Sequence, residues 1–577
     1  MDEFFERLAL RAATIDELLT DAFEVLPGQK ADTNLAARRL AAWCRSCASG
    51  DWTLFLRRLT KDGLSFDQVL PRLSTVRRNP NTPLPFWISD AQWIDEALKI
   101  PANYRTIEWL RRAGDPQAFE HLLAPVVESA RELLWSGLPE GAGNNLTDTA
   151  VAGLCHSLAQ RLSILTAPAL YSCFISFPVP DRKRMSPGQA DHPTGAAPAR
   201  YDQFVTEMRE GGFRRLFEAK PVLLRLIASV TRQWIDTTQE LLVRLHLDLP
   251  KIREELLHIS HEALVSQVSG GLGDLHNSGR SVQLICFTDG CRILYKPKDL
   301  RLDVMWGSVV ERLNASAPPI DLRTPRVIAC DGYGWNEFID YTECSDPGGF
   351  ERFFRRAGAW LCLFHIFAGT DMHEDNMIAA GDHPVPIDLE TILQAAEEGD
   401  DTAIAERHAF ELAGRKIADS VIITGLLPAY GRSPENTVFG HGGLHNPQNQ
   451  TPERYWENIN TDSMKPVESW KSETGFKNIP KFDGNQARLG DFIDALVAGY
   501  EAYAEFMSRY RATAAGSVIF DGFAGLPARR LLRPTRFYAL LLERLKDHRN
   551  MADGAEWSAH LDFTARLMDW DKPADPW

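Results

Sequence analysis

The segment Gly369–Ile378 reads Gly-Thr-Asp-Met-His-Glu-Asp-Asn-Met-Ile, and the later segment Pro386–Glu390 reads Pro-Ile-Asp-Leu-Glu. The first segment places Asp371 and Asn376 five residues apart in a polar turn that follows an apolar run. A further acidic residue, Asp388, ends a short strand-like stretch. Apolar run, polar turn, strand and acid thus follow one another within about thirty residues, which is the spacing of consecutive secondary-structure elements.

This order is the layout of a kinase catalytic loop and its metal-binding acid. Phosphoryl transfer needs one carboxylate to orient a hydroxyl group, and an Asn with another carboxylate to hold magnesium on the phosphates. We therefore expect Asp371 in the first role and Asn376 and Asp388 in the second. The alternative is an Asx-rich turn before a strand that ends in Asp by chance. Lys296 favours the kinase interpretation because a strand-borne Lys holds nucleotide phosphates in kinases, although lysines also end strands without any such role.

The bulk composition is that of a globular protein with a sizeable core. The chain has 577 residues, of which 44% are hydrophobic and 24% charged, so three to four domain-sized units are expected. Lysine and arginine number 63 and aspartate and glutamate 78, giving a net charge of −15. An acidic chain is a poor candidate for general binding to nucleic acid or to an anionic membrane. We found no apolar run long enough for a membrane span and predict none.

The cysteines indicate a reducing compartment. Nine are scattered along the chain, and no signal peptide opens the sequence, so we expect a cytoplasmic protein with free thiols. Cys44 and Cys47 have zinc or redox spacing, but no second pair follows at metal-finger distance. We interpret them as small buried residues of a helix.

The organisation along the chain predicts an α+β fold. We expect a kinase-like core of two lobes, a small one containing a sheet and a large helical one, preceded by a large helical N-terminal region. The expected domains are a helical N-terminal and capping region (1–255), a small lobe (256–345) and a large lobe carrying activation and elimination elements (346–577). The expected elements are helices over the first 180 or so residues, with Phe23 on a helical face; an exposed loop (182–200); helices from 201 to about 265; a hairpin (281–287 with 291–296); a strand pair (326–330 with 334–339); and a long, partly ordered excursion (428–485).

Two further segments carry charge patterns that a simple kinase leaves unused. The glycine-rich stretch 270–280 contains Asp274, His276 and Arg280, and its spacing matches no Walker or Rossmann pattern. It is either a plain loop or a segment that places an acid, a base and a cation together. Near the C-terminus, Arg529 and Arg533 would share a face if the following helix extended back to them, and would form a phosphate site; otherwise they form a solvated basic face.

At these residues the chain closely resembles the dehydratase domain of class II lanthipeptide synthetases, the LanM type. The resemblance extends from about 200 to 540 and rests on several separated motifs. These motifs are Tyr201–Val205, Gly273–Arg280, Leu294–Pro297, Tyr333–Phe338, Gly369–Ile378, Ile387–Thr391, Asn458–Met464 and Arg529–Thr535.

The resemblance implies a core similar to lipid kinases and a two-step reaction. Such enzymes use ATP and Mg²⁺ to phosphorylate Ser and Thr in the core region of a precursor peptide, which also carries a leader. They then eliminate the phosphate to leave dehydroalanine or dehydrobutyrine. By resemblance, nucleotide, metal and phosphorylation chemistry falls to Lys296, Asp371, His373, Asn376, Asp388 and Glu390, with Asn376 and Asp388 as the Mg²⁺ ligands. Asp274 and His276 match the first catalytic motif, Arg529 and Thr535 match the elimination motif, and Lys296 could act in both steps.

One departure from the family pattern concerns ring formation. Full-length members continue into a zinc-dependent cyclase domain, and this chain carries no Cys-His-Gly motif, so no cyclase activity is expected from it. A cyclase would be supplied by further sequence or by another chain. Two other functions stay open: a kinase without lyase activity that acts on a protein or small molecule, and a catalytically inactive kinase-like scaffold that binds a peptide. Intact Lys296, Asp371, Asn376 and Asp388 argue against the scaffold.

Overall fold

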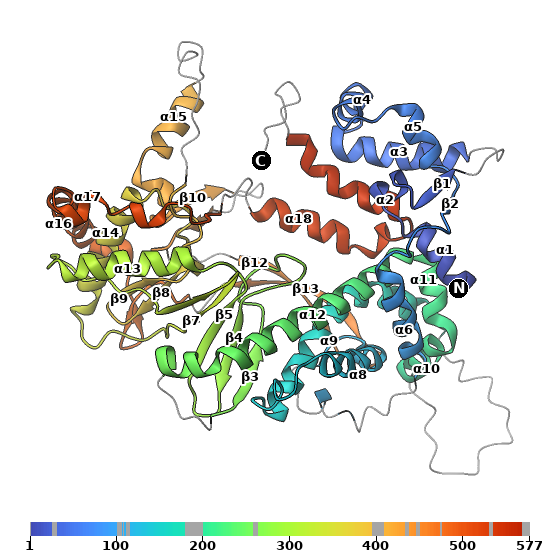
Figure 1. Ribbon diagram of the computed structural model, residues 1–577, viewed down its shortest axis with the longest axis horizontal. Coiled ribbons are helices and arrows are strands. Elements are labelled where there is room, and N and C mark those ends of the chain that lie inside the picture. Colours follow the sequence, from blue (N-terminus) through green and yellow to red (C-terminus); the bar gives the residue numbers. More distant parts are fainter. Residues whose placement is uncertain are drawn as a thin grey trace.

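The computed structural model combines helices with small antiparallel sheets, which confirms the α+β expectation (Figure 1). The kinase-like arrangement of two lobes and the three domain boundaries stay predictions. The structure describes residues 2–25, 32–100, 107, 109–110, 116–178, 200–257, 263–394, 409–432, 438–445, 450–472, 476–529 and 535–567. The loop expected over 182–200 falls almost entirely outside these residues.

The N-terminal region is helical, as predicted, with one exception near its start. Phe23, expected on a helix, begins a short strand that pairs antiparallel with a second one, β1 (Phe23–Val25) with β2 (Val76–Arg78). Local capping explains several helix starts: Thr14 and Glu17 form a reciprocal capping box at the start of α2. The helices are α1 (Glu3–Arg11), α2 (Ile15–Leu19), α3 (Thr33–Ala48), α4 (Trp52–Lys61), α5 (Phe66–Arg72), α6 (Trp87–Leu98), α8 (Glu120–Ser136), α9 (Asp148–Ser176), α10 (Arg200–Glu207), η1 (Met208–Gly212), α11 (Phe213–Ala219), α12 (Pro221–Ile252) and η2 (Arg253–Leu257).

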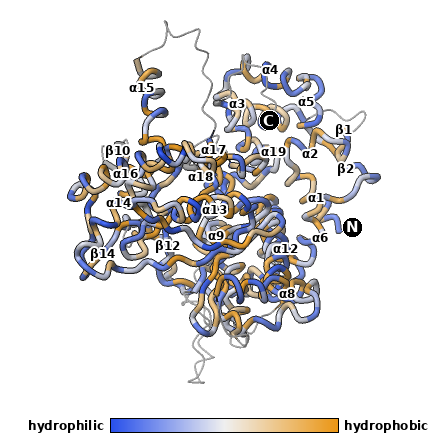
Figure 2. The backbone as a smooth tube through the Cα atoms, turned by 60° about the vertical axis from the view of Figure 1, so that its left-hand side comes forward, coloured by the Kyte–Doolittle hydropathy of each residue, from blue (hydrophilic) through white to orange (hydrophobic). Residues whose placement is uncertain are grey.

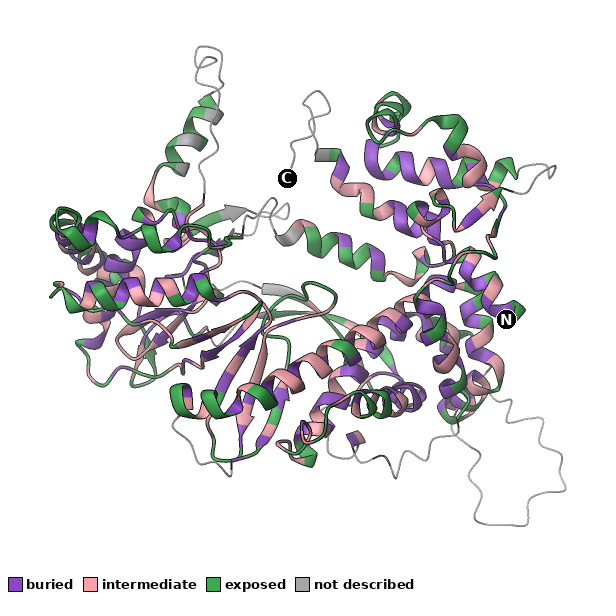
Figure 3. Cartoon of the chain, in the orientation of Figure 1, coloured by how far each residue is buried: buried purple, intermediate pink, exposed green. Residues whose placement is uncertain are grey.

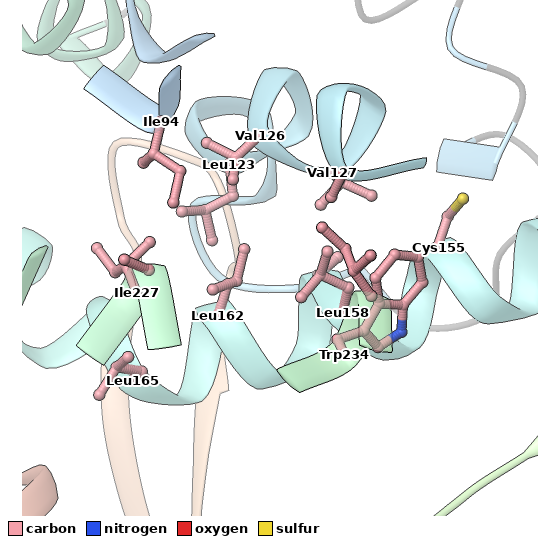
Figure 4. Close-up of a cluster of buried hydrophobic side chains, with 14 of the residues drawn as sticks. Ile94, Leu123, Val126, Val127, Cys155, Leu158, Leu162, Leu165, Ile227 and Trp234 are labelled. Carbon is pink, nitrogen blue, oxygen red and sulfur yellow. The ribbon is translucent and has the colours of Figure 1, made fainter. Parts of the chain in front are cut away.

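The core of this region lies between α8, α9 and α12. Leu158 and Leu162 of α9 face Val127 of α8, and Trp234 of α12 packs beside them (Figure 4). The buried indole of Trp234 donates a 3.0 Å hydrogen bond to the hydroxyl oxygen of Ser157, so its one polar atom is satisfied. Burial of such side chains is the main stabilising contribution to the region.

Helix α9 is also long and apolar enough to cross a membrane. Just over half of its most apolar stretch, 56%, is buried inside the protein, and α9 lies in the middle of the molecule in the view of Figure 2. A core helix passes the same test of length and composition, so this is weak evidence for a span. Within the described residues no other helix passes it.

The predicted interpretation of Cys44 and Cys47 is confirmed. Both lie buried in α3, and burial raises the pKa of the Cys47 thiol to about 12. All nine cysteines lie within the described residues and are free. A thiol held protonated in this way is a poor metal ligand or nucleophile.

A five-stranded antiparallel sheet follows the N-terminal helices. Both predicted strand pairs are confirmed, around the turns at Gly290 and Gly332. The helical expectation is wrong for Val265–Ser269, which forms a strand at the sheet edge instead, because its backbone pairs with a partner strand about twenty residues away. The strands, in the spatial order β3-β4-β5-β7-β6, are β3 (Val265–Ser269), β4 (Gln283–Phe287), β5 (Arg292–Lys296), β7 (Tyr333–Glu337) and β6 (Val327–Cys330).

One face of α12 joins this sheet to the N-terminal helices. Asp248 accepts 2.8 Å hydrogen bonds from the Tyr333 hydroxyl and the Trp335 indole. One turn earlier on the same face, Arg244 donates to the Tyr295 hydroxyl at 2.5 Å and lies over the Tyr333 ring. The polar stripe of α12 therefore fixes the sheet against the helical region.

The C-terminal half is built on two helices that touch backbone to backbone, α14 and α16. A Cβ atom at Gly499 would lie 2.0 Å from the Arg355 carbonyl oxygen, and one at Gly358 would lie 2.0 Å from the Leu496 carbonyl oxygen. Only glycine permits this approach. The helices here are α13 (Arg301–Ala315), α14 (Gly349–Ile366), η3 (Glu374–Asn376), α15 (Ala409–Ala418), η5 (Val421–Thr424), η6 (Leu489–Phe492), α16 (Ile493–Arg511), α17 (Ala514–Ser517), η7 (Asp521–Phe523), α18 (Thr535–Lys546), η8 (His548–Asn550), α19 (Gly554–Ser558) and η9 (Ala559–Leu567), and the strands of one hairpin are β8 (Met377–Ala380) and β9 (His383–Pro386).

The region 428–485 is more regular than expected. Its described residues form two-stranded antiparallel ribbons, and the tip of the longest reaches the N-terminal helices. There Asn460 accepts hydrogen bonds from the Phe119 amide (2.7 Å) and the Tyr201 hydroxyl (2.8 Å) and donates one to the Gln117 carbonyl oxygen (3.0 Å). The strands are β10 (Ala429–Arg432), β11 (Val438–His441), β12 (Gln450–Glu457), β13 (Lys465–Ser472), β14 (Lys481–Phe482) and β15 (Asn485–Gln486).

The last described segment returns to the start of the chain. Ala555, Ala559 and Ala565 pack into the same apolar cluster as Trp43 and Phe55. Helices α19 and η9 therefore lie against α2 and α3, while α18 crosses between them and the α13–α16 region (Figure 1).

Candidate functional site

The turn after α14 holds Asp371 in an uncommon backbone conformation. Asp371 has φ 63°, in the left-handed region that few residues other than Gly, Asn and Asp adopt. Its neighbours fix it on both sides. The Thr391 hydroxyl donates a 2.6 Å hydrogen bond to the Thr370 carbonyl oxygen, and the Met372 amide donates one of 2.8 Å to the Thr424 carbonyl oxygen. The carboxylate of Asp371 is thus carried on a rigid turn.

The β8–β9 hairpin brings Asn376 and Asp388 together. Met377 pairs with Pro386, and the Ile387 amide donates a 3.0 Å hydrogen bond to the Asn376 carbonyl oxygen. The two predicted metal ligands therefore flank the open end of one hairpin. The side-chain amide of Asn376 donates a 2.8 Å hydrogen bond to the Asp371 carbonyl oxygen, which turns its own oxygen outward as a possible ligand.

Two lysines from the five-stranded sheet reach this end of the hairpin. Lys296 is buried, and its ammonium group donates a 2.7 Å hydrogen bond to the Ile387 carbonyl oxygen. Lys298 donates to the Asp388 carboxylate at 2.8 Å and to the Glu390 carboxylate at 2.7 Å. The sequence prediction included Lys296 and missed Lys298. Two residues further along an extended chain, Lys298 would point to the same side as Lys296, which is the signal that could have found it.

Charge pairing dominates the ionisation of this cluster. Burial, the largest influence on Asp388, raises its pKa, but Lys298 and Lys296 together outweigh burial and hold the pKa of Asp388 below its ordinary value. Burial lowers the pKa of Lys298, and the two carboxylates more than reverse this effect, so that its pKa is raised. Both groups are charged at neutral pH.

Asp371 behaves differently from Asp388. Burial raises the pKa of Asp371, and the charges of Asp388 and Glu390 raise it further, while His373 and Arg529 lower it. The net direction is upward. A carboxylate whose pKa moves toward neutrality is a better acceptor for a proton than an ordinary exposed one.

Arg529 joins the cluster from far along the chain. Its guanidinium forms an ion pair with the Glu390 carboxylate, and its amide donates a 3.1 Å hydrogen bond to the Glu390 carbonyl oxygen. The Gln394 side chain donates a 2.6 Å hydrogen bond to the Arg529 carbonyl oxygen. Arg529 precedes α18 and lies outside it, so the idea that Arg529 and Arg533 share a helical face is wrong for Arg529. Arg533 lies outside the described residues.

A buried acid behind the lysines completes the constellation. Asp303 of α13 is 5% exposed, and burial raises its pKa against the opposing charges of Lys296 and Lys298. Sequence reasoning missed Asp303 because nothing local distinguishes it from other helical acids. It is the only buried carboxylate of the cluster that is not bonded to a lysine in the described part of the chain.

His373 begins η3 beside Asp371. Its ring nitrogen Nδ1 accepts a 3.3 Å hydrogen bond from the Asp375 amide, and its side chain is partly exposed. The neighbouring Glu374 points away from the cluster and accepts 3.0 Å hydrogen bonds from the His441 ring and the Gly442 amide. His373 can thus reach solvent and substrate, while Glu374 fastens the β10–β11 region to the turn.

The stretch 270–280 forms a tight exposed loop. His276 and Arg280 exchange backbone hydrogen bonds of 2.7 and 2.8 Å, and Arg280 pairs with Glu240 of α12 at 2.8 Å. The side chains of Asp274 and His276 are exposed and make no hydrogen bond or ion pair to another described residue. The structure does not join these two predicted residues to the cluster, and their catalytic roles stay predictions.

Thr535 is the remaining predicted site residue. It is the first residue of α18 as described, and its side chain lies outside the described part of the structure. The structure thus brings seven predicted residues together: Lys296, Asp371, His373, Asn376, Asp388, Glu390 and Arg529.

Residues that could hold Mg²⁺ are few and are oxygen donors. Among the described residues, no group of three or more His, Cys, Asp or Glu has the arrangement of a metal site. The Asn376 amide oxygen and the Asp388 carboxylate fit Mg²⁺, which is commonly held by one or two protein oxygens together with substrate phosphates and water. The donor set therefore suits a cation that arrives with a nucleotide.

Comparison with known proteins adds a family and a relative. The family described as "Domain of unknown function (DUF4135)" matches residues 221–576, which is more than half of the chain. A relative from Lactococcus lactis subsp. lactis, the "Lacticin 481/lactococcin biosynthesis protein LcnDR2", is 22% identical over 371 residues. The match covers 60% of this chain and 38% of the relative, so the chain spans well under half of that protein's length. The match over 221–576 contains every predicted site residue, and the chain belongs to the DUF4135 family.

Proposed function

We propose that this protein is a lanthipeptide dehydratase that modifies a precursor peptide in two steps. It phosphorylates Ser and Thr residues with ATP and Mg²⁺, and it then eliminates the phosphate to leave dehydroalanine or dehydrobutyrine. The observation that carries the proposal is the convergence of Lys296, Lys298, Asp371, Asn376, Asp388 and Arg529 on one hairpin end. The motif resemblance to LanM enzymes and the name of the lactococcal relative support the same reading.

The phosphorylation half uses the residues of the rigid turn and hairpin. Asp371 is placed to accept a hydrogen bond from the Ser or Thr hydroxyl and to take its proton as the oxygen attacks. Lys296 and Lys298 supply positive charge that offsets the developing charge on phosphate oxygens. Asn376 and Asp388 would hold Mg²⁺. When bound, ATP supplies the phosphoryl group, and the protein positions the hydroxyl group in line with it.

The elimination half needs a base for the α-proton and cations for the departing phosphate. The proton leaves the α-carbon, the bond between the β-carbon and oxygen breaks, and the electron pair goes to phosphate. Arg529, next to Glu390 and within electrostatic reach of Asp371, is suited to the departing phosphate. Lys296 lies on the same cluster and suits the developing enolate. Asp274, His276 and Thr535 enter this half through the motif resemblance alone.

A kinase without lyase activity is the alternative, and the site disfavours it. An enzyme that only transfers phosphate has no need of a guanidinium beside the acidic end of the hairpin. Arg529 forms its ion pair with Glu390 across 139 residues of sequence, together with a backbone hydrogen bond between the same two residues. Such a reinforced long-range contact supports a role for Arg529 in the chemistry.

The mass of a precursor peptide after incubation with the protein, ATP and Mg²⁺ tests the proposal. Dehydration lowers the mass by about 18 Da per residue, and phosphorylation alone raises it by about 80 Da, so the two steps have separate signatures. A panel of Ser- and Thr-containing precursor peptides should include at least one that loses mass. Gain of mass without any loss would establish the kinase-only alternative, and no change with any peptide would overturn both.

A further inference from the structure

A cavity of about 600 Å³ lies between the first helices and the C-terminal segment, away from the hairpin cluster. Its walls come from α1, α3, α18, η8, α19 and η9, which are far apart in sequence. Six arginines line it: Arg11, Arg38, Arg45, Arg544, Arg549 and Arg566. The only acids in its lining, among the described residues, are Asp553 and Glu556. An acidic chain of net charge −15 thus carries one concave site that is strongly basic.

Most of this positive charge is not neutralised by the protein itself. Arg38 pairs with Glu556, and Arg549 pairs with Asp547 at 2.6 Å. Asp553 is already occupied by Arg39, a buried residue outside the cavity lining, at 2.8 Å.

The other four arginines have no carboxylate partner among the described residues. Arg11 and Arg566 donate only to backbone carbonyl oxygens, including that of Ala552 at 3.2 Å from Arg11. Arg544 lies over the Phe563 ring, and Arg45 makes no side-chain contact of these kinds with a described residue. These guanidiniums keep donors free for an anionic ligand, and the planar fork of arginine suits carboxylates in particular.

The helix ends at the cavity argue against a small phosphate as the intended ligand. Phosphate sites commonly use the free backbone N–H groups at a helix N-terminus. Here the cavity meets C-terminal ends: Arg11 ends α1, Arg45 lies in the last turn of α3, and Arg544 lies in the last turn of α18. Anion binding would depend on side chains alone, spread over several segments, which suits an extended ligand with several carboxylates.

Helix α18 adds an apolar surface that leads to the cavity. Tyr538, Leu540 and Leu542 are 41%, 48% and 50% exposed, and the helix shows a mostly exposed surface in Figure 3. Leu540 stands one turn before Arg544, on the same face. The exposed apolar side chains begin near the N-terminal end of α18, the end that follows the Arg529 segment, and run for most of the helix, which is about 18 Å long.

We propose that this cavity binds an acidic segment of polypeptide that also carries apolar side chains, with its carboxylates on the arginines and its apolar residues along α18. Under the proposed function, on which this identification of the ligand rests, the segment belongs to the precursor peptide outside the residues that are modified. The cavity would hold the substrate while its Ser and Thr residues reach the hairpin cluster in turn.

A binding measurement without ATP or Mg²⁺ tests this site separately from the chemistry. The probe is a short fluorescein-labelled peptide of Glu and Leu residues, and the comparison peptide has Gln in place of every Glu. Fluorescence anisotropy with the full chain should show binding of the Glu peptide, weakened by added salt, and at least about tenfold weaker binding of the Gln peptide.

The double variant Arg45→Gln/Arg544→Gln should weaken binding of the Glu peptide by about tenfold or more without lowering the thermal unfolding midpoint, because neither guanidinium has an ion-pair partner to lose. Arg509→Gln is the matched control, since Arg509 is an exposed helical arginine paired with Glu505 elsewhere on the surface. No binding of the Glu peptide, equal binding of the Gln peptide, or full affinity in the double variant would each overturn the proposal. Displacement of the probe by micromolar inorganic phosphate would also overturn it, in favour of a small-anion site.

The two proposals fail in distinguishable ways. If the probe binds as described but no peptide is dehydrated, the acidic-peptide site stands and the dehydratase function falls. If peptides are dehydrated and the double variant dehydrates them with unchanged KM, the function stands and this site is not the substrate's.

Discussion

The ammonium group of Lys296 lies 2.7 Å from the carbonyl oxygen of Ile387, one residue before Asp388, and not against a carboxylate. Lys298 takes the carboxylates instead, at 2.8 Å from Asp388 and 2.7 Å from Glu390. The division is physically sensible, because a lysine tied to a neutral carbonyl keeps its full charge for a ligand. Lys298 neutralises the acids in the free protein, and Lys296 stays available for phosphate.

The first prediction follows from the position of Lys298. Lys298→Met should lower the free energy of unfolding by about 2 kcal/mol, because two partly buried carboxylates lose their shared cation. Urea denaturation at pH 7 measures this loss. Lys465→Met is the matched control, since Lys465 pairs with Glu457 on the exposed β12–β13 ribbon at 3.1 Å and should change stability little. Equal losses in the two variants would show that the Lys298 cluster has no special electrostatic role.

The second prediction separates the two chemical steps. Asp371→Asn should abolish all modification, with at least a hundredfold or so loss of activity, because the proton acceptor is removed while Asn still tolerates the left-handed backbone at this position. Arg529→Ala should let phosphopeptide accumulate, because phosphorylation continues and the departing phosphate loses its cation. Mass spectrometry of the peptide over time distinguishes the two outcomes.

The control and the contrary result for this pair are direct. Arg509→Ala removes an exposed arginine far from the hairpin cluster and should dehydrate normally. If Arg529→Ala also dehydrates at the normal rate, then the assignment of Arg529 to elimination is wrong, whatever Asp371 does.

The turn chemistry and much of the site could be predicted from the sequence because the relevant contacts are local. Asn376 and Asp388 are joined by one hairpin, and the turns at Gly290 and Gly332 are close-range signals. The lysines and acids were more difficult. Whether Lys296 or Lys298 meets Asp388 depends on how a strand lies against a hairpin about ninety residues later, and no local pattern encodes this.

Longer-range relationships were the least predictable. The pairing of Arg529 with Glu390 followed from motif resemblance, not from spacing. The strand at Val265–Ser269 was taken for helix because five residues give too little periodicity to decide. The contact of Asn460 with the Phe119 amide spans 341 residues, and the surrounding Gly-, Pro- and Asn-rich sequence suggested only an irregular excursion.

The third prediction concerns the contact between α14 and α16. Gly499→Ala should lower the free energy of unfolding by about 1–3 kcal/mol, because its Cβ would lie 2.0 Å from the Arg355 carbonyl oxygen and the helices would have to separate. Gly490→Ala is the control, since a Cβ there meets nothing within 4 Å and should change stability by less than about 0.5 kcal/mol. Chemical denaturation of the two variants in parallel provides the comparison. A stable Gly499→Ala protein would show that α14 and α16 are not in backbone contact.

The fourth prediction tests the docking of the β12–β13 tip on the N-terminal helices. Asn460→Asp keeps the oxygen that accepts from the Phe119 amide and suits the left-handed φ of 60°, but it loses the donor to the Gln117 carbonyl oxygen. The new carboxylate also faces Glu120, whose pKa burial already raises.

We expect the tip to undock in the Asn460→Asp protein, so that backbone amides of β12 and β13 exchange with deuterium at least about tenfold faster at neutral pH. Asn458→Asp is a closely matched control, because Asn458 has a similar φ of 50° in the same turn and its side chain reaches only the local Ser463 carbonyl oxygen. Faster exchange in both variants would trace the effect to the turn itself. Unchanged exchange in Asn460→Asp would mean that the ribbon is held by its other contacts, such as the packing of Trp456 on Tyr171.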